Sequence, residues 1–422
     1  MKRIAVVGAG IAGLSCAWLL SRRYEVTLFE SGQEAGGHTN TVDFSLEGKT
    51  FPVDTGFLVF NDRTYPNLCA MLDSLGVGTA KSDMSFSVTI ESEGLEWAGS
   101  TIGSLFAQRR NALNPRFLGM LGDILRFNRE ATALVSAVDA GSGTLGEFLE
   151  QGRYGTAFRD WYLLPMSAAI WSCPTATMLR YPAQTFFRFC HNHGLLAIRG
   201  RPRWRTVSGG GREYVRRIVS SLQDVRLGTP VSGIRRNSES IVVHSARNGA
   251  EVFDGVVLAT HGDQSLRLLA DAVDAEREIL GAFRFQDNHA WLHTDESVLP
   301  RARGAWAAWN YRAGLPRPDG QPVSVSYLIN RLQPLPCARP VIVSLNPSSD
   351  PAPHSVSAVF RYSHPVFDFP AVKAQQRLGE IQGRDRTWFC GAWTGYGFHE
   401  DGLRSALAVA NGLGVEAPWQ TA

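Results

Sequence analysis

Lysine is scarce in this chain. Of the 42 basic residues among its 422, only Lys2, Lys49, Lys81 and Lys373 are lysines, and the others are arginines. Few positions could therefore supply a lysine amine to an active site. The net charge of +3 is also small, which argues against a partner role for nucleic acid.

Cysteine motifs and long apolar runs are lacking as well. The six cysteines, at positions 16, 69, 173, 190, 337 and 390, show no Cys-X-X-Cys or other metal-ligand spacing, so no metal site is expected. We expect Cys16 and Cys390 to be buried free thiols. The longest charge-free run, 161–179, is too broken by prolines and polar residues to span a membrane. The first strand begins within a few residues of Met1, which leaves no room for a signal peptide, and we expect a cytoplasmic protein.

The N-terminus carries the strongest motif. An apolar strand pattern at 4–7 leads into Gly8-Ala9-Gly10-Ile11-Ala12-Gly13 and then a helical pattern. In such a turn the first glycine permits the tight bend, the second lets the backbone approach a pyrophosphate, and the third lets helix and strand pack closely. The helix N-terminus would supply N–H donors to the anion. A second predicted strand, 25–29, ends at Glu30, which is placed to accept ribose hydroxyls. This order of elements predicts a dinucleotide site.

The pattern along the chain predicts two interleaved domains. Residues from about 80 to 204 are rich in aromatics and arginine and carry no nucleotide motif. After them, a glycine turn with a helix at 208–222 and later apolar strands resemble the pattern of the N-terminal domain again. We predict an α/β fold: a discontinuous, Rossmann-like dinucleotide-binding domain and an inserted α+β substrate domain. The first is expected to comprise 1–78, 205–265 and 381–422, and the second 79–204 and 266–380.

Four ordered motifs resemble the flavin-containing amine oxidase and phytoene desaturase superfamily over most of the chain, including a bacterial branch of FAD/NAD-binding, amine-oxidase-like proteins. The motifs are Gly36-Gly37-His38, Asp54-Thr55-Gly56 beside the flavin, Pro230-Val231-Ser232 beside the adenine, and Gly391-Ala392-Trp393 with Glu400-Asp401-Gly402-Leu403 over the isoalloxazine. The resemblance implies a glutathione-reductase or amine-oxidase type of domain and FAD as the cofactor. The expected cofactor-binding residues are Gly8, Gly10, Ile11, Ala12, Gly13, Glu30, Ser31, Gly36, Gly37, His38, Thr39, Asp54, Thr55, Gly56, Phe57, Val231, Thr260, Gly391, Ala392, Asp401, Gly402 and Leu403.

Physical reasoning also favours FAD over NAD. An extended FAD needs phosphate donors at one turn and a distant glycine turn at its ring. A helix beginning at Gly402 would direct its positive end toward flavin N1 and O2. No second dinucleotide motif is present, because the glycines at 208–211 follow no apolar strand. We therefore expect dioxygen or another acceptor, rather than NAD(P)H, to reoxidise the flavin.

The catalytic candidates are Trp393, Tyr396 and His399. Many amine-oxidase relatives place a lysine near flavin N5, but none of the four lysines here lies at a matching position. Trp393 and Tyr396, with Phe398, could wall the flavin face or only pack around it. His399 could tune the chemistry or merely cap a helix. His38 is expected by the phosphates, and covalent attachment of the flavin through it stays open.

Three further segments carry recognition signals. The segment 187–206 holds His191, His193, Arg199, Arg201, Arg203 and Arg205 and could bind an anionic head group or form a solvated loop. The segment 102–130 alternates apolar residues with arginines and could contact an anionic membrane, or be a core-facing helix with a basic outer face. The run 161–179 suits an apolar pocket or the core.

The leading hypothesis is an FAD-dependent oxidoreductase that removes hydride from an apolar, fatty-acyl or lipid-like small molecule. The missing lysine and the apolar segments favour it. The alternatives are an amine oxidase, a non-redox flavin isomerase, and a non-catalytic FAD-binding protein. Peripheral membrane contact through 102–130 is a possibility that the sequence leaves open, with a core-facing helix the more common explanation of such a segment.

Overall fold

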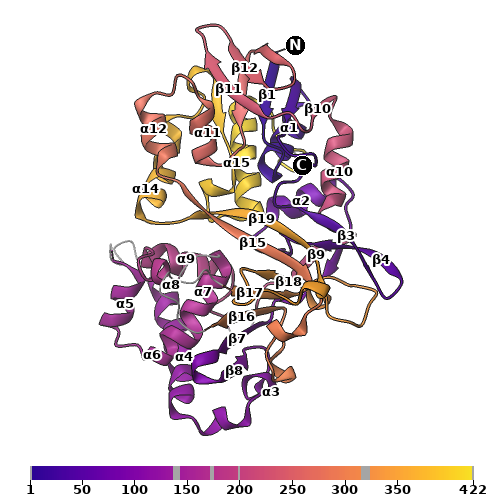
Figure 1. Ribbon diagram of the computed structural model, residues 1–422. Helices are drawn as coiled ribbons and strands as arrows, with labels where there is room; N and C mark the ends of the chain where they lie inside the picture. The colour runs from indigo at the N-terminus through magenta and orange to yellow at the C-terminus, as the bar shows by residue number, and fades with distance from the viewer. Residues whose placement is uncertain (1, 136–142, 172–174, 198–199, 315–323, 421–422) are drawn as a thin grey trace.

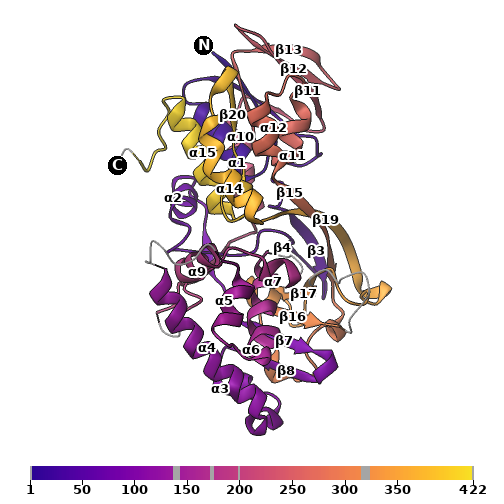
Figure 2. The ribbon, with the colours of Figure 1, turned by 90° about the vertical axis from the view of Figure 1, so that its left-hand side faces the viewer.

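The computed structural model describes residues 2–135, 143–171, 175–197, 200–314 and 324–420. It has an upper part built on a parallel sheet and a lower part built on a larger mixed sheet with a helical layer (Figure 1). Both chain ends lie in the upper part (Figures 1 and 2). This α/β arrangement confirms the predicted fold class.

The upper sheet has five parallel strands drawn from three separate stretches of chain. In spatial order they are β10 (Asp224–Arg226), β2 (Glu25–Phe29), β1 (Arg3–Val7), β14 (Gly255–Leu258) and β20 (Thr387–Phe389). The helices α1 (Ile11–Leu20), α10 (Arg212–Ser221) and α15 (His399–Gly412) share one apolar core with this sheet. Because the sheet is covered on both faces, its strands are almost continuously buried.

The other face of this sheet packs on a second core. It is covered by the antiparallel strands β11 (Val231–Arg236), β12 (Ile241–Ser245) and β13 (Gly249–Phe253) and by α11 (Gly262–Leu268), α12 (Asp274–Gly281) and α14 (Phe369–Arg377). The expected substrate domain included 266–283 and 368–380, but their buried side chains belong to this core. We propose placing these two boundaries near residues 284 and 367.

The lower sheet has seven strands. Their order is β19 (Val356–Val366), β15 (Arg284–His293), β18 (Ile342–Leu345), β17 (Ser324–Leu328), β16 (Trp309–Ala313), β7 (Phe86–Ile90) and β8 (Leu95–Ala98), with only the β16–β7 pair parallel. The long strands β15 and β19 pair with each other over ten positions and run between the two parts (Figure 1).

A helical layer packs on the lower sheet. It contains α3 (Ile102–Leu105), α4 (Pro115–Leu134), α5 (Leu145–Gln151), α6 (Thr156–Phe158), the π-helical turn η3 (Arg159–Leu163), α7 (Leu164–Trp171), α8 (Thr175–Leu179) and α9 (Ala183–Asn192). An aromatic-rich core fills the space between the sheet and this layer. None of the helices in the described ranges is both long and apolar enough to cross a membrane.

Smaller elements join the two parts. They are the hairpin β3 (Thr41–Leu46) and β4 (Lys49–Asp54), the sheet of β5 (Phe60–Asn61), β9 (Trp204–Val207) and β6 (Thr79–Lys81), and the helices α2 (Pro66–Ser74) and α13 (Ile329–Leu332). Glu47 and Gly48 turn the β3–β4 hairpin with φ of 54° and 71°. Cys16 and Cys390 are buried free thiols, as expected, whereas Cys173 lies outside the described residues.

The last helix differs from the expectation. It begins at His399 rather than at Gly402. The Asp401 carboxylate accepts the Phe398 N–H at 3.0 Å, which satisfies a backbone donor at the helix start. Glu400, its neighbour, accepts the Leu68 N–H at 3.0 Å and so caps α2. Glu400 and Asp401, which were expected in the ring-binding motif, therefore each accept a hydrogen bond at the start of a helix.

Candidate FAD and substrate cavity

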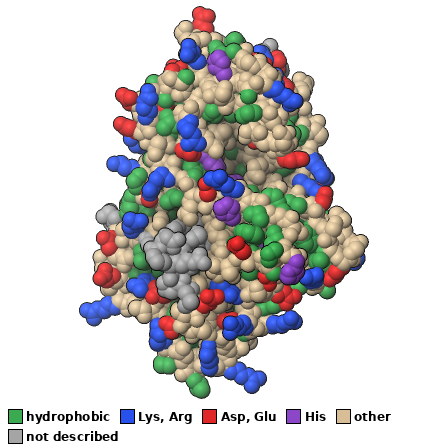
Figure 3. All heavy atoms as spheres, in the orientation of Figure 1, with side chains coloured by type: hydrophobic (Ala, Val, Ile, Leu, Met, Phe, Trp, Pro, Cys, Tyr) green, Lys and Arg blue, Asp and Glu red, His purple; other side chains and the backbone are tan. Residues whose placement is uncertain are grey.

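A large cavity runs between the two parts of the molecule. Its volume is ≈ 1260 Å³, larger than the roughly 300–1,000 Å³ of pockets that hold one small molecule. One end is lined by the N-terminal glycine turn and the other by the lower helical layer. Figure 3 shows a hollow between the upper and lower parts with histidine side chains beside it.

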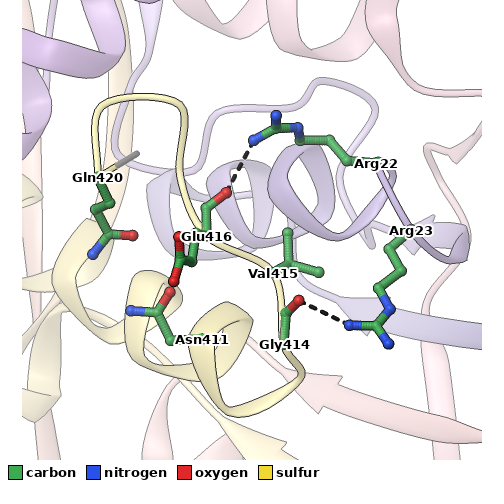
Figure 4. A pocket seen from close by; sticks show the side chains of 7 residues that line it. All are labelled: Arg22, Arg23, Asn411, Gly414, Val415, Glu416 and Gln420. Carbon is green, nitrogen blue, oxygen red and sulfur yellow. Dashed lines mark hydrogen bonds between the residues drawn. The ribbon is translucent and has the colours of Figure 1, made fainter. Parts of the chain in front are cut away.

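A second pocket of ≈ 620 Å³ lies at the end of α1 and shares no lining residue with the cavity. Arg22 and Arg23 point into the segment that follows α15 (Figure 4). Each donates to a backbone carbonyl at 2.9 Å, Arg22 to Glu416 and Arg23 to Gly414. These contacts fasten the C-terminal segment, so we assign this pocket a structural role.

The glycine turn is shaped to receive a phosphate. Gly8 has φ +101° and donates its N–H to Phe29 O at 2.8 Å. A Cβ on Gly13 would overlap the Gly8 carbonyl, so this glycine allows α1 to pack against the strand end. A Cβ on Gly10 would meet no atom within 4 Å. Gly10 caps α1 without a side-chain hydrogen bond, which leaves first-turn N–H groups free for an anion.

The Glu30 carboxylate is held beside this turn. Its Oε2 accepts the Ala9 N–H at 2.7 Å and its Oε1 accepts the Gly32 N–H at 2.8 Å. Oε1 also accepts the Ser31 hydroxyl at 3.1 Å, so Oε2 is the oxygen that keeps a lone pair for a ribose hydroxyl. Ser31, Val231 and Thr260 line the same end of the cavity.

His38 supplies an independent test of the cofactor. Its Nε2 is buried and has no hydrogen-bond partner within the described part of the chain. Its pKa lies well below the usual value, chiefly because of burial and then because of His364 and His261 nearby. The ring packs on Tyr362, with centroids 5.1 Å apart. A neutral ring nitrogen left without a partner in a cavity wall fits a polar atom of a bound cofactor.

His399 lies at the start of α15, beside the segment that carries His38. Its ring stacks on Phe57, with centroids 3.6 Å apart and planes 16° apart. Its Nε2 lies 2.9 Å from Thr39 Oγ1 and 3.2 Å from the Tyr214 hydroxyl. Burial lowers its pKa to about 3, so the ring is neutral near pH 7. This geometry positions Phe57 at the cavity wall and gives His399 no charge to contribute.

The two aromatic candidates occupy different places. Trp393 is buried, donates its indole N–H to Thr260 O at 3.0 Å and packs on Phe283, with ring centroids 4.5 Å apart. It is therefore anchored in the upper core, although it also lines the cavity. The Tyr396 ring centroid lies 5.5 Å from that of Phe189 in the lower helical layer. Tyr396 thus belongs to the part of the cavity wall that meets the lower helical layer.

Most of the predicted residues meet in this cavity. Those that line it are Gly8, Gly10, Ile11, Ala12, Glu30, Ser31, Gly36, Gly37, His38, Thr55, Gly56, Phe57, Val231, Thr260, Gly391, Ala392, Trp393, Tyr396 and His399. Those that lie behind it are Gly13, Thr39, Asp54, Asp401, Gly402 and Leu403.

The residues behind the cavity support its walls. Asp54 accepts hydrogen bonds from the Gly211 N–H at 3.0 Å and from Gln333 Nε2 at 2.8 Å, and burial raises its pKa to about 6. It thereby joins β4 to the start of α10. A Cβ on Gly402 would lie 2.9 Å from Ile11 Cγ2, so this glycine lets α15 approach the start of α1.

Other lining residues were missed or only partly foreseen from sequence. Tyr362 and His364 line the cavity from β19, within a stretch that carries no motif. Their spacing of two along a strand is the one signal that could have paired them on a single face. In the basic segment, His193 and Arg201 line the cavity, whereas Arg199 lies outside the described residues.

The fold and the cavity together define a flavoenzyme that binds FAD in its upper part. The chain belongs to the flavin containing amine oxidoreductase family, whose model matches residues 11–284. It is therefore an FAD-dependent oxidoreductase, as the sequence motifs predicted.

Solved structures share the whole fold. A CLA-producing fatty acid isomerase from P. acnes is 16% identical, with a TM-score of 0.69, over 97% of this chain and 98% of that one. Cyclohexylamine oxidase from Brevibacterium oxydans IH-35A is 14% identical, with a TM-score of 0.67, over 98% and 99%. At these identities the likeness concerns the fold alone.

One curated relative matches locally. The carotenoid phi-ring synthase of Chlorobaculum tepidum is 42% identical over 79 residues, which is 18% of this chain and 12% of the relative. The chain thus covers about an eighth of that protein's length.

Proposed function

We propose that this oxidoreductase removes hydride from an acyl-chain or similarly apolar substrate held in the lower part of the cavity. The observation that carries the proposal is the composition of that part of the wall. Its side chains come from α4, α7, β16 and β17 and include Leu121, Ile124, Met166, Ile170, Trp309 and Tyr327. Burial of an extended hydrocarbon against such a surface is favourable by about 25 cal/mol per Å².

Charged groups in the lower cavity do not suit an alkylammonium ion. All four lysines are described, and none lines the cavity. The Asp83 carboxylate lines it, but it accepts the Ser85 N–H at 2.9 Å and the Ser85 hydroxyl at 2.7 Å and pairs with Arg331 at 3.3 Å. An amine would therefore find no unengaged carboxylate here, which favours a neutral chain over an amine.

Bound FAD supplies the two-electron acceptor for a hydride. The protein's part is to hold a substrate C–H near the ring and to keep water away. The apolar walls exclude water, while Tyr396 and Phe398 close the cavity against Phe189, whose ring centroid lies 5.5 Å from each of theirs. His399, held neutral, positions Phe57 rather than carrying charge.

Anaerobic mixing of the FAD-loaded protein with a panel of lipids and amines tests the proposal. We expect fatty acyl lipids or polyenes to bleach the oxidised flavin band, and air to restore it. Bleaching by amines and by no lipid would overturn it. A cavity-filling variant, Ile170→Trp, should slow bleaching by long chains more than by short ones, while an exposed-site control, Val252→Trp, should change neither.

Isomerisation of an unsaturated chain is the second candidate. The same apolar cavity beside FAD would serve it, and the P. acnes fatty acid isomerase shares this fold. Under the same anaerobic conditions it predicts a product with a shifted double bond and no lasting loss of oxidised flavin. Mass-neutral product formation would therefore replace dehydrogenation by isomerisation.

A further inference from the structure

We infer that the lower tip of the molecule docks on an anionic lipid bilayer and takes an acyl chain from it into the cavity. The docking surface, termed here the α3–α4 face, is formed by Ile102, Leu113, Leu118 and Leu125 with the arginines around them. The delivery of substrate rests on the proposed function, whereas the docking itself does not.

Exposed apolar side chains concentrate on this face. Ile102 is 80% exposed, Leu113 87%, Leu118 45% and Leu125 56%. These four are half of the eight large apolar side chains that are exposed in the described part of the chain. Scattered apolar residues are ordinary on a protein surface, but a contiguous group marks a contact site.

Helix α4 is apolar on two opposite sides. Phe117, Met120, Phe127 and Ala131 are buried against the core. Leu118, Gly119, Gly122 and Leu125 are exposed and lie within one another's reach along the helix at spacings of three and four. A surface helix normally presents polar residues to solvent, so this exposed stripe is unexplained by packing within the chain.

The charge around the stripe has one dominant sign. Arg109, Arg110, Arg116 and Arg129 are exposed there. Arg116 pairs with Glu93 at 3.3 Å, and Arg110 donates to the Gly94 carbonyl. The acidic residues of α4 itself are engaged, since Asp123 pairs with Arg126 at 3.0 Å and Glu130 accepts the Tyr154 hydroxyl at 2.6 Å. Basic residues near a membrane surface attract anionic lipid by about 1 kcal/mol each.

The cavity opens on the same face. Leu125 is exposed and also lines the cavity, so it marks an opening on α4. Leu121 and Ile124, on the adjoining sides of the helix, line the cavity beyond it. Asn128, one turn further, has a buried Oδ1 with no hydrogen-bond partner among the described residues, and it too lines the cavity. A chain entering past Leu125 would meet apolar walls and one polar anchor.

A bilayer fits this face better than a second protein surface. The α3 and α4 ends form a projecting tip rather than a groove (Figures 1 and 2). Apolar side chains at that tip have arginines beside them (Figure 3). Interfacial elements insert apolar side chains between lipids and set basic ones against the headgroups. We therefore take anionic lipid as the partner of the α3–α4 face.

Vesicle sedimentation of the FAD-loaded protein tests the docking. The protein should sediment with phosphatidylglycerol-containing vesicles and much less with pure phosphatidylcholine, and salt should weaken binding. The triple variant Ile102→Glu, Leu113→Glu, Leu118→Glu should bind at least ten-fold more weakly. The matched control is Val252→Glu, Val273→Glu, Phe369→Glu, which changes exposed apolar residues elsewhere and should bind like the parent protein. Equal binding by both triple variants, or none by the parent, would overturn the inference.

Two further measurements separate the alternatives. If the α3–α4 triple variant instead converts a dimer to a monomer in ultracentrifugation and leaves vesicle binding unchanged, the face is a self-association surface and the inference is wrong. Flavin bleaching by a monomeric short-chain lipid should be equal in the parent and the triple variant. Docking without any lipid-dependent bleaching would refute the proposed function and leave the docking intact.

Discussion

Separate replacement of Gly10 and Gly13 should distinguish a residue needed for cofactor binding from one needed for stability. Gly10 has φ −75° and ψ −177°, a conformation open to alanine, and a Cβ there would meet no protein atom within 4 Å. Gly10→Ala should therefore fold normally, at a cost of no more than about 1 kcal/mol for alanine at a helix N-cap. The new methyl would lie where the pyrophosphate approaches the turn.

The expected loss of FAD affinity follows from the displaced contacts. A hydrogen bond to a charged group contributes about 1.5–3 kcal/mol. Losing one would weaken the Kd by about 10- to 150-fold. Gly13→Ala should behave differently, because its Cβ would overlap the Gly8 carbonyl and force α1 away from the strand. Overpacking of this kind costs about 1–3 kcal/mol or more, so this variant should lose stability before it loses affinity.

FAD titration followed by flavin fluorescence, with thermal unfolding of each apoprotein, measures both quantities. Gly412→Ala is the matched control, since its Cβ also meets nothing within 4 Å and it lies at the far end of α15. It should leave FAD affinity unchanged and should not lower stability, since alanine is up to about 1 kcal/mol more favourable than glycine in a helix. The reasoning would be refuted if Gly10→Ala bound FAD as tightly as the parent protein, or if it unfolded as early as Gly13→Ala.

Three other predictions concern the groups behind and beyond the cofactor. The pKa of Asp54 is raised to about 6 by burial, so the folded state binds its proton more tightly than the unfolded one and this contribution to stability is lost as pH rises from about 4 through 6. Two pKa units correspond to about 3 kcal/mol. In urea unfolding, the stability of Asp54→Asn relative to that of the parent protein should therefore increase by up to this amount between pH 4 and pH 8. A stability difference that stays constant with pH would contradict this prediction. The pKa of His399 is lowered to about 3, so the ring stays neutral near pH 6.5. The pH profile of the flavin-reduction rate should therefore have the same shape around pH 6.5 in the parent protein and in His399→Asn. Arg201 lines the cavity and is exposed, so Arg201→Gln should raise the KM for a free fatty acid several-fold but leave that for its methyl ester unchanged, as steady-state assays would show.

The glycine turn at the upper end of the cavity could be predicted from sequence because its backbone conformation permits only certain residues. Glycine is required where φ is positive, as at Gly8, or where chains touch, as at Gly13, and such demands fix residue identity at fixed spacing. The same holds for Gly48 in the hairpin turn, where φ is 71°. Strand, turn and helix therefore follow from local sequence.

Long-range pairing explains what the sequence did not reveal. His364 reaches the cavity because β19 pairs with β15 across more than seventy intervening residues, an arrangement that no local pattern records. Asp401 was expected at the ring, but a carboxylate near a helix start suits a cap as well as a ligand, and the structure uses it as a cap. Trp393, one of the catalytic candidates, lines the cavity while its indole N–H is held by Thr260 O.

The contrast between the two ends of the cavity also bears on specificity. The hydrogen bonds that the turn would donate to a dinucleotide and that Glu30 would accept from it are directional, so we expect the upper end to be selective for one dinucleotide. The walls formed by Met166, Ile170 and their neighbours contribute by burial of area, which is not directional. Each methylene excluded from water adds about 0.8 kcal/mol. Affinity should thus rise steadily with chain length until the cavity is full, while selectivity for position along the chain must come from the few polar groups, Asn128 and Arg201 among them.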